Sequence, residues 1–185
     1  NLKVRFSLNN NSVLIISPES WGKSKVSKHH YALTFANKGY TVYFLNIVFN
    51  AKDAKDEVCS EHENIKLIKI YIPKLLNFFR FYQRWIYNFL LKKLIKERIR
   101  KHPSFNLLIS FDCNGVFTDL SLFRAKKTLF FPVDQVNSKH LKEYLGFDLL
   151  CSVSNVILER FPNAKNSMLF NHGLSNVFFE NKSSL

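Results

Sequence analysis

Short apolar runs alternate along the chain with longer stretches in which apolar and polar residues are mixed. Several runs are apolar at nearly every position, which is typical of parallel strands covered on both faces. The predicted strands are residues 12–17, 41–46, 65–72, 106–111, 127–133, 147–153 and 166–170. The predicted helices are residues 25–38, 74–101, 115–124, 137–145 and 154–161. This alternation predicts an α/β fold with a doubly wound (Rossmann-like), mostly parallel sheet of about seven strands and helices on both faces.

A single domain accounts for nearly the whole length of 185 residues. We expect residues 1–180 to form one Rossmann-like domain and residues 181–185 to begin a linker. In such a sheet the functional groups lie at the carboxyl ends of the strands. The chain has five glycines and no Gly-x-Gly-x-x-Gly sequence, so the pattern does not favour a dinucleotide site.

The net charge of +13 indicates an anionic partner, which leaves nucleic acid, a phospholipid surface or a phosphorylated substrate as candidates. The three cysteines are far apart and show no Cys-x-x-Cys spacing, so we interpret them as thiols in a reducing compartment and predict no metal site. No signal peptide is visible, and the apolar run at residues 85–91 is too short to span a bilayer. These features favour a cytoplasmic protein, either in solution or at a membrane surface.

Most of the net positive charge, +8 of +13, lies in residues 74–101, which hold nine Lys or Arg residues and one acidic residue. Aromatic residues are interleaved with these cations. One interpretation is a long helix that covers the sheet and has a solvated basic face. The other is an interfacial helix on anionic lipid, because aromatic rings beside Lys and Arg suit the headgroup region. The membrane-binding residues would be Arg80, Arg84, Trp85, Lys92, Lys93 and Lys96.

Nucleic acid is the competing partner for this basic stretch. No RNA- or DNA-binding motif accompanies the charge, and the aromatic residues are embedded among Leu and Ile. We therefore expect an anionic membrane surface and no nucleic acid. A basic membrane- or nucleic-acid-binding module without catalysis remains an alternative function.

Gly22-Lys23-Ser24 has the sequence that ends a phosphate-binding P-loop, which makes a P-loop-like kinase or ATPase a second alternative. The motif needs a Gly five positions before Gly22, where this chain has Ser17. Pro18 has no backbone N–H to offer a phosphate. The pattern therefore favours an ordinary strand-to-helix turn.

Three stretches, taken together, resemble a known family. They are residues 18–46, a strand–loop–helix unit with an early His; residues 126–135, a strand ending in Asp; and residues 147–179, which include Asn171-His172-Gly173. Their order is similar to that of the N-terminal domain of GT-B glycosyltransferases, in the retaining group that includes capsule, teichuronic acid and lipopolysaccharide enzymes. Two departures are the single Gly in the first loop and the residue inserted between Asn171 and Gly173.

The resemblance implies an acceptor-binding domain of a hexosyltransferase-type enzyme. Such an enzyme transfers a sugar from a nucleotide-sugar donor to a lipid-linked or cell-envelope glycan acceptor. The donor would bind in a C-terminal domain beyond residue 185, so no cofactor is expected here and this part alone would be inactive. The expected partners are the glycan acceptor and an anionic membrane, which implies a cytoplasmic protein attached peripherally to the inner membrane face.

Site residues are predicted at the ends of strands and in the first loop. Asp134 follows an apolar strand and is the candidate catalytic residue, with helix capping as its alternative role. Trp21 would stack on a sugar ring or pack under its loop, and Asp112 would bind substrate or form a turn. The predicted substrate-binding residues are Trp21, Gly22, Lys23, His29, His30, Asp112 and Asn171.

Overall fold

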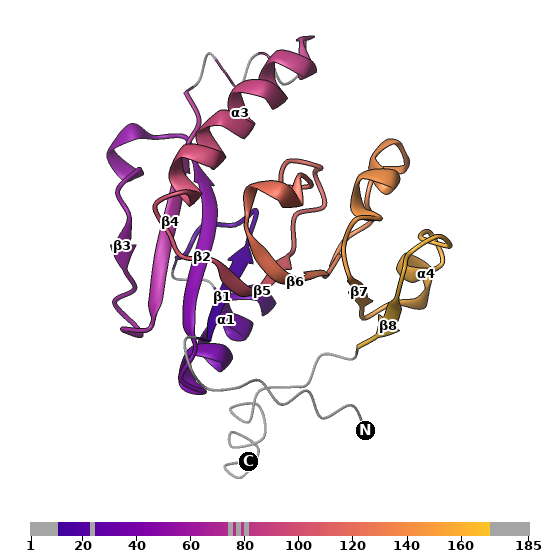
Figure 1. Ribbon diagram of the computed structural model, residues 1–185, viewed down its shortest axis with the longest axis horizontal. Helices are drawn as coiled ribbons and strands as arrows, with labels where there is room; N and C mark the ends of the chain where they lie inside the picture. Colours follow the sequence, from indigo (N-terminus) through magenta and orange to yellow (C-terminus); the bar gives the residue numbers. More distant parts are fainter. Residues whose placement is uncertain (1–10, 23–24, 74–75, 77–78, 80–81, 171–185) are drawn as a thin grey trace, which may run out of the picture.

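The structure, a computed structural model, describes residues 11–22, 25–73, 76, 79 and 82–170, with Arg84 described by its backbone alone. These residues form an eight-stranded sheet in the order β3-β4-β2-β1-β5-β6-β7-β8 (Figure 1). The strands are β1 Ser12–Ile16, β2 Thr41–Val48, β3 Glu57–Val58, β4 Ile65–Tyr71, β5 Phe105–Ser110, β6 Ala125–Phe130, β7 Leu149–Ser152 and β8 Ser167–Leu169. The helices are α1 Ser27–Asn37, α3 Arg84–Ile99 and α4 Asn155–Leu158, and the 3₁₀ turns are η1 Ala51–Asp53, η2 Leu120–Leu122 and η3 Ser138–Tyr144.

The predicted fold class is confirmed. Every strand pair is parallel except β3 with β4, which is antiparallel. All seven predicted strands are present, with ends that shift by a few residues. The eighth strand, β3, has only two residues, both of them exposed, so no apolar run in the sequence predicts it.

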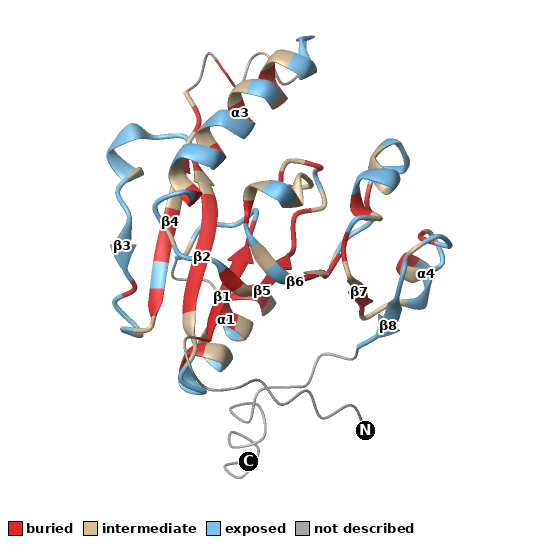
Figure 2. Ribbon diagram, in the orientation of Figure 1, coloured by how far each residue is buried: buried red, intermediate tan, exposed pale blue. Residues whose placement is uncertain are grey.

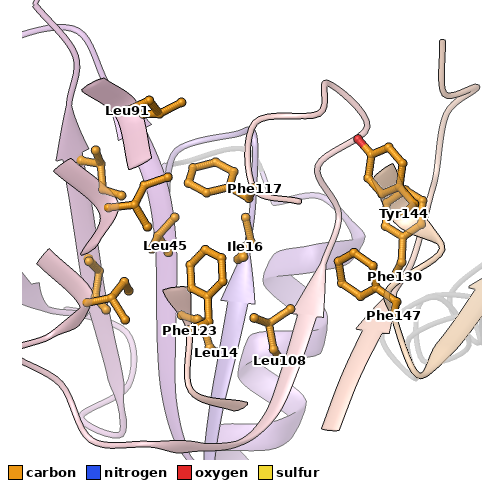
Figure 3. Close-up of a cluster of buried hydrophobic side chains, with 14 of the residues drawn as sticks. Leu14, Ile16, Leu45, Leu91, Leu108, Phe117, Phe123, Phe130, Tyr144 and Phe147 are labelled. Carbon is orange, nitrogen blue, oxygen red and sulfur yellow. The ribbon is translucent and has the colours of Figure 1, made fainter. Parts of the chain in front are cut away.

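The core lies on both faces of the sheet, around β1. All five β1 residues are buried, and their side chains alternate between the faces. On one face Leu14 and Ile16 belong to a cluster that includes Leu91 of α3 (Figure 3). On the other face Val13 and Ile15 pack in a cluster with α1. Figure 2 shows that burial is greatest in these central strands, as expected when a sheet is covered on both sides.

An aromatic group extends the α3-side core towards β7. The rings of Phe130 and Tyr144 are stacked with centroids 4.1 Å apart. Phe147 and Phe161 lie 5.5 and 6.0 Å from Phe130 (Figure 3 shows the first of these). Aromatic pairs at these separations stabilise a core beyond the area that they bury. The group anchors η3 and α4 to the sheet.

Three of the predicted helices are wrong in extent or type. Residues 115–124 form a loop with the short turn η2, because Asp112 binds the backbone of that loop. Residues 137–145 form the 3₁₀ segment η3, which the side chain of Asn137 caps. The helix predicted at 154–161 shortens to α4, which ends at Leu158. A short stretch with a few apolar positions can match the helical period by chance. Its tertiary contacts then decide its conformation.

The long basic helix predicted for residues 74–101 is also corrected. The described helix α3 begins at Arg84, after Gln83, whose φ of −139° and ψ of 68° are not helical. Leu76, Phe79 and Tyr82, which precede Gln83, are helical as well, so the predicted helix is interrupted at Gln83. The ten residues before Arg84 include 74–75, 77–78 and 80–81, which lie outside the described residues, and Arg80 is among them.

Truncation of a core ring tests this packing. Phe130→Ala should lower the free energy of unfolding by about 3–5 kcal/mol, because Phe130 is fully buried and stacked on Tyr144. Phe89→Ala is the matched control, since Phe89 is 67% exposed, and it should change stability by less than about 0.5 kcal/mol. Urea unfolding followed by circular dichroism measures both. Equal losses in the two variants would contradict the packing described.

Candidate functional site

The carboxyl ends of β1, β5 and β6 lie side by side at one edge of the sheet. Ile16 of β1 is level with Ser110 of β5, and Ser110 is level with Phe130 of β6. Backbone bonds continue past the strand ends, since Phe111 N–H donates to the Ile16 carbonyl at 3.0 Å and Phe131 N–H to the Ser110 carbonyl at 2.8 Å. Three loops therefore start from the same edge, and this is the edge at which open parallel sheets bind their ligands.

The loop after β1 is fixed by His29, in the first turn of α1. His29 Nδ1 accepts from the Val26 N–H at 3.1 Å, which makes Nε2 the protonated nitrogen that donates to the Ser20 carbonyl at 3.2 Å. The ring is 1% exposed and stacks on Phe44. Burial lowers the pKa of His29, with the bond to Ser20 as the largest opposing effect. In this structure the imidazole is neutral and supports the loop backbone.

Trp21 lies on the β2 side of the same loop. Its ring meets His29 and Phe44 edge to face at 5.1 and 5.0 Å, and Nε1–H donates to Glu61 at 3.3 Å. The Lys25 ammonium lies 4.6 Å above the ring and 2.6 Å from Glu61. Lys25 also holds the pKa of Glu61 below its usual value.

Trp21 and Gly22 line a hollow of about 390 Å³ beside the β3–β4 edge. Its other lining residues are Glu57, Val58, Ser60, Glu61 and Leu67. These residues come from β3, β4 and the connection between the two strands. The hollow is therefore built by the loop after β1 and one edge of the sheet, and Asp134 is not among its lining residues.

Asp112 follows β5 and is 2% exposed. One carboxylate oxygen accepts from the N–H groups of Val116 at 2.8 Å and Phe117 at 3.1 Å, and the other from Asn114 at 3.0 Å. The Tyr144 hydroxyl donates to the Asp112 carbonyl at 2.9 Å. The carboxylate therefore shapes its own loop, which is the turn-forming role weighed from the sequence.

Asp134 is exposed at the end of β6 and faces solvent without capping a helix. Its backbone carbonyl receives the Cys113 thiol at 3.7 Å, which ties the loop after β6 to the loop after β5. Burial raises the pKa of Cys113, so this thiol stays protonated. In the described part of the chain no hydrogen bond or ion pair engages the Asp134 carboxylate.

The structure brings some predicted site residues together and separates others. Trp21 and Gly22 belong to the loop after β1, which His29 supports from α1, and Asp112 and Asp134 belong to two loops joined through Cys113. His30 is exposed on α1, where its carbonyl accepts from Thr34 at 2.8 Å. The positions of Lys23 and Asn171 lie outside the described residues. The substrate roles of all these residues stay predictions.

The sequence reasoning missed two buried polar residues around the loop after β1, Asn46 and Lys28. Asn46 is fully buried near the end of β2 and donates to the Ser20 hydroxyl at 3.1 Å. Lys28 is 3% exposed in α1 and pairs with Glu19. The sequence gives only weak signs of their burial. Asn46 stands at the end of an apolar run, where a polar residue is ordinary, and nothing distinguishes Lys28 from the other Lys and Arg residues, 27 in all.

Exposed aromatic rings lie in the N-terminal half of α3 and just before it. Trp85 and Phe89 of α3 are 74% and 67% exposed, and Tyr82, two residues before the helix, is 73% exposed. Lys92, Lys93 and Lys96 are exposed farther along the helix, and Lys92 lies 2.9 Å from Asp119. The side chain of Arg84 is not among those described. No described helix combines the length and the apolar character that a membrane span requires.

The buried His29 and the half-buried His102 predict how stability depends on pH. Burial lowers the pKa of His29 and His102 below 6.5, so the unfolded chain binds protons more readily than the folded one. The contribution of these neutral imidazoles to the free energy of unfolding is complete above pH 6.5, and it is lost as the pH falls below that value. His29→Gln should flatten the decline of unfolding free energy between about pH 7 and 5, whereas His30→Gln, at an exposed position, should not. Urea titrations at several pH values measure this slope. An unchanged slope in His29→Gln would show that His29 is not buried as described.

No protein-family model and no curated protein sequence matches the chain. Solved structures do match its fold. A trehalose-6-phosphate structure from E. coli, bound with UDP-2-fluoro glucose, aligns with a TM-score of 0.67 and 9% identity over 95% of this chain and 52% of its own. Sucrose-phosphate synthase from Thermosynechococcus elongatus aligns with a TM-score of 0.62 and 13% identity over 89% of this chain and 49% of its own.

A further match is an alpha,alpha-trehalose-phosphate synthase (UDP-forming) from Burkholderia xenovorans in complex with glucose-6-phosphate. Its TM-score is 0.53 and its identity 12%, over 83% of this chain and 43% of its own. The chain thus spans about half the length of these three proteins. Such low identities establish the fold alone. The chain has the Rossmann-like fold of a GT-B glycosyltransferase domain, as its sequence motifs predicted.

Proposed function

We propose that the chain is the acceptor-binding side of a glycosyltransferase that moves a sugar from a nucleotide-sugar donor to a lipid-linked or cell-envelope glycan. The observation that carries this proposal is the alignment of 95% of the chain with half of a glycosyltransferase at a TM-score of 0.67. That neighbour is bound with UDP-2-fluoro glucose, and another is in complex with glucose-6-phosphate. The edge formed by the ends of β1, β5 and β6 is the natural place for the acceptor.

Asp134 is the proposed acid–base residue for the acceptor. Its carboxylate is exposed at that edge, and its backbone is held by Cys113. An exposed carboxylate can orient an acceptor hydroxyl or accept its proton during transfer. Asp112 is less suited to this role, because its two oxygens already accept three backbone N–H groups. We therefore assign Asp112 to positioning the loop and Asp134 to the acceptor.

Attachment to an anionic membrane is the second part of the proposal. Trp85 and Phe89 are one helical turn apart on α3, and both are mostly exposed. Figure 1 shows the N-terminal half of α3 extending beyond the ends of the strands. Exposed aromatic rings followed by Lys92, Lys93 and Lys96 fit the headgroup region of a bilayer. A lipid-linked acceptor would then reach the candidate site from the membrane.

Asp134→Asn tests the acid–base role. In membranes that contain the whole gene product, transfer from labelled UDP-glucose, UDP-galactose or UDP-N-acetylglucosamine should fall by ~10²-fold or more, the usual scale for a positioned acid–base group. Donor affinity should be unchanged. Asp53→Asn is the matched control, because Asp53 is exposed in η1, and it should keep full activity. Wild-type rates in Asp134→Asn would remove Asp134 from the chemistry.

Vesicle binding tests the membrane surface. The double variant Trp85→Ser, Phe89→Ser should lose co-sedimentation with phosphatidylglycerol-rich vesicles by about tenfold or more, since both rings lose their apolar contact with lipid. Val156→Ser is the matched control, because Val156 is 62% exposed but lies on α4. Raised salt should weaken wild-type binding. Undiminished binding of the double variant, or preferential release by an oligonucleotide, would contradict this role for α3.

A further inference from the structure

A hollow of about 540 Å³ lies between β4 and the C-terminal half of α3. It lies beside a part of β4 that β3 does not cover, because β3 pairs only with Lys66 and Leu67. Farther along β4, Lys69 and Tyr71 line the hollow, and Leu94 of α3 lines it as well. None of its lining residues comes from the loops after β1, β5 and β6, so the hollow is separate from the candidate acceptor edge.

Positive charge predominates in the lining of this hollow. The charged lining residues are four cations, Lys69, Arg98, Arg100 and Lys101, and one acid, Glu97. The hollow also lies at the end of residues 74–101, which hold nine Lys or Arg residues and one acidic residue. Such a concentration of one sign of charge attracts anions to the surface that bears it.

The guanidinium of Arg98 is held in place and still has donors to offer. Its Nη2 lies 2.9 Å from Asp56 and donates to the Ala54 carbonyl. Within the described residues, Nη1 has no hydrogen-bond partner, and the side chain is 27% exposed. Nε is buried, so Nη1 is the nitrogen available to a ligand. A guanidinium presents its N–H groups in a rigid fork that suits the oxygens of a phosphate.

Arg100 and Lys101 supply positive charge that is not balanced. Both are exposed, and in the described part of the chain neither forms an ion pair, whereas Lys69 is paired with Glu57. Glu97 offsets one of the two charges, and the C-terminus of α3 adds a partial negative charge of about half a unit. The hollow therefore keeps an excess of positive charge, which favours an anion over a neutral or cationic ligand.

We propose that this hollow binds the phosphate group of a phosphorylated ligand, with Arg98, Arg100 and Lys101 as its cationic contacts. A phosphate has enough oxygens to accept from all three side chains at once. The Tyr71 hydroxyl has no hydrogen-bond partner within the described residues, so it is available as a further donor. Two sources share this chemistry, a phosphorylated metabolite in solution and a phospholipid headgroup. The inference goes beyond the proposed function, because the site is not the acceptor edge.

Phosphate titrations followed by ¹H–¹⁵N NMR of the 185-residue chain test this site. Sodium phosphate is added up to ~50 mM at constant ionic strength, a range suited to weak sites. The backbone amides of Lys69, Tyr71, Arg98 and Lys101 should shift with one common dissociation constant. Sodium chloride at the same ionic strength should leave these amides nearly unchanged, because it only screens charge.

A pair of double variants separates this site from general charge attraction. Arg100→Gln, Lys101→Gln should weaken phosphate binding by about tenfold or more, because two charge-assisted hydrogen bonds are lost. Lys38→Gln, Lys139→Gln is the matched control, since it removes the same charge at exposed positions outside the hollow. It should change phosphate binding by less than about twofold. All four positions are exposed, so both variants should fold.

Glu97→Gln gives a test of opposite sign. Loss of the carboxylate that repels an anion should strengthen phosphate binding by about threefold. Glu159→Gln, at an exposed position just after α4, should leave it unchanged. A merely structural role for Glu97 would not produce this gain.

Vesicles distinguish the two sources of the phosphate. A loss of about fivefold in binding of Arg100→Gln, Lys101→Gln to phosphatidylglycerol vesicles, relative to the Lys38→Gln, Lys139→Gln control, identifies a lipid headgroup. Unchanged vesicle binding beside weakened phosphate binding identifies a ligand in solution.

Two results would overturn the site. One is the absence of phosphate-induced shifts around the hollow, and the other is equal weakening of phosphate binding in the two double variants. Either result would leave the glycosyltransferase proposal in place, because Asp134 does not line the hollow.

Discussion

The parallel pairing of β1 with β2 on one side and β5 on the other is the constraint on which the rest of the structure depends. Every β1 residue is buried, and the registers on both sides are continuous. Parallel pairing sends each connection back over a face of the sheet, so that α1 and α3 cover opposite faces of it. It also leaves the loops after β1, β5 and β6 at one edge, although more than a hundred residues separate the first from the last.

Those loops contain two kinds of polar group. The carboxylate of Asp112 and the ring of His29 are buried and bound to backbone, so they fix loop shape. The carboxylates of Asp134 and Glu19 face solvent from positions set by Cys113 and Lys28. Rigid support behind exposed functional groups is what a binding site needs, because a ligand then meets groups that are already oriented. By strand spacing, the ends of β1 and β6 are roughly 10 Å apart, which suits an extended glycan.

The sheet could be predicted from the sequence because buried parallel strands appear as continuous apolar runs. The two-residue strand β3 could not, since its pairing is defined by β4 and not by its own residues. The helices predicted after β5 and β6 failed because Asp112 and Asn137 bind backbone N–H groups locally, which competes with helix formation. The sequence could not distinguish the loop-forming role of Asp112 from the solvent-exposed carboxylate of Asp134, because both residues follow apolar strands. It also could not predict that Asn46, at the end of an apolar run, is buried. Side-chain partners, which only the structure supplies, make these distinctions.

The proposal that this chain is the acceptor side of a glycosyltransferase can be tested in the source cells. The measurement is the incorporation of label from nucleotide sugars into lipid-extractable and envelope glycans. Membranes from cells with the gene intact, deleted and restored would be compared. We expect one labelled glycan to disappear on deletion and to return on restoration. Identical labelled glycans in all three membranes, with each donor supplied in turn, would contradict it.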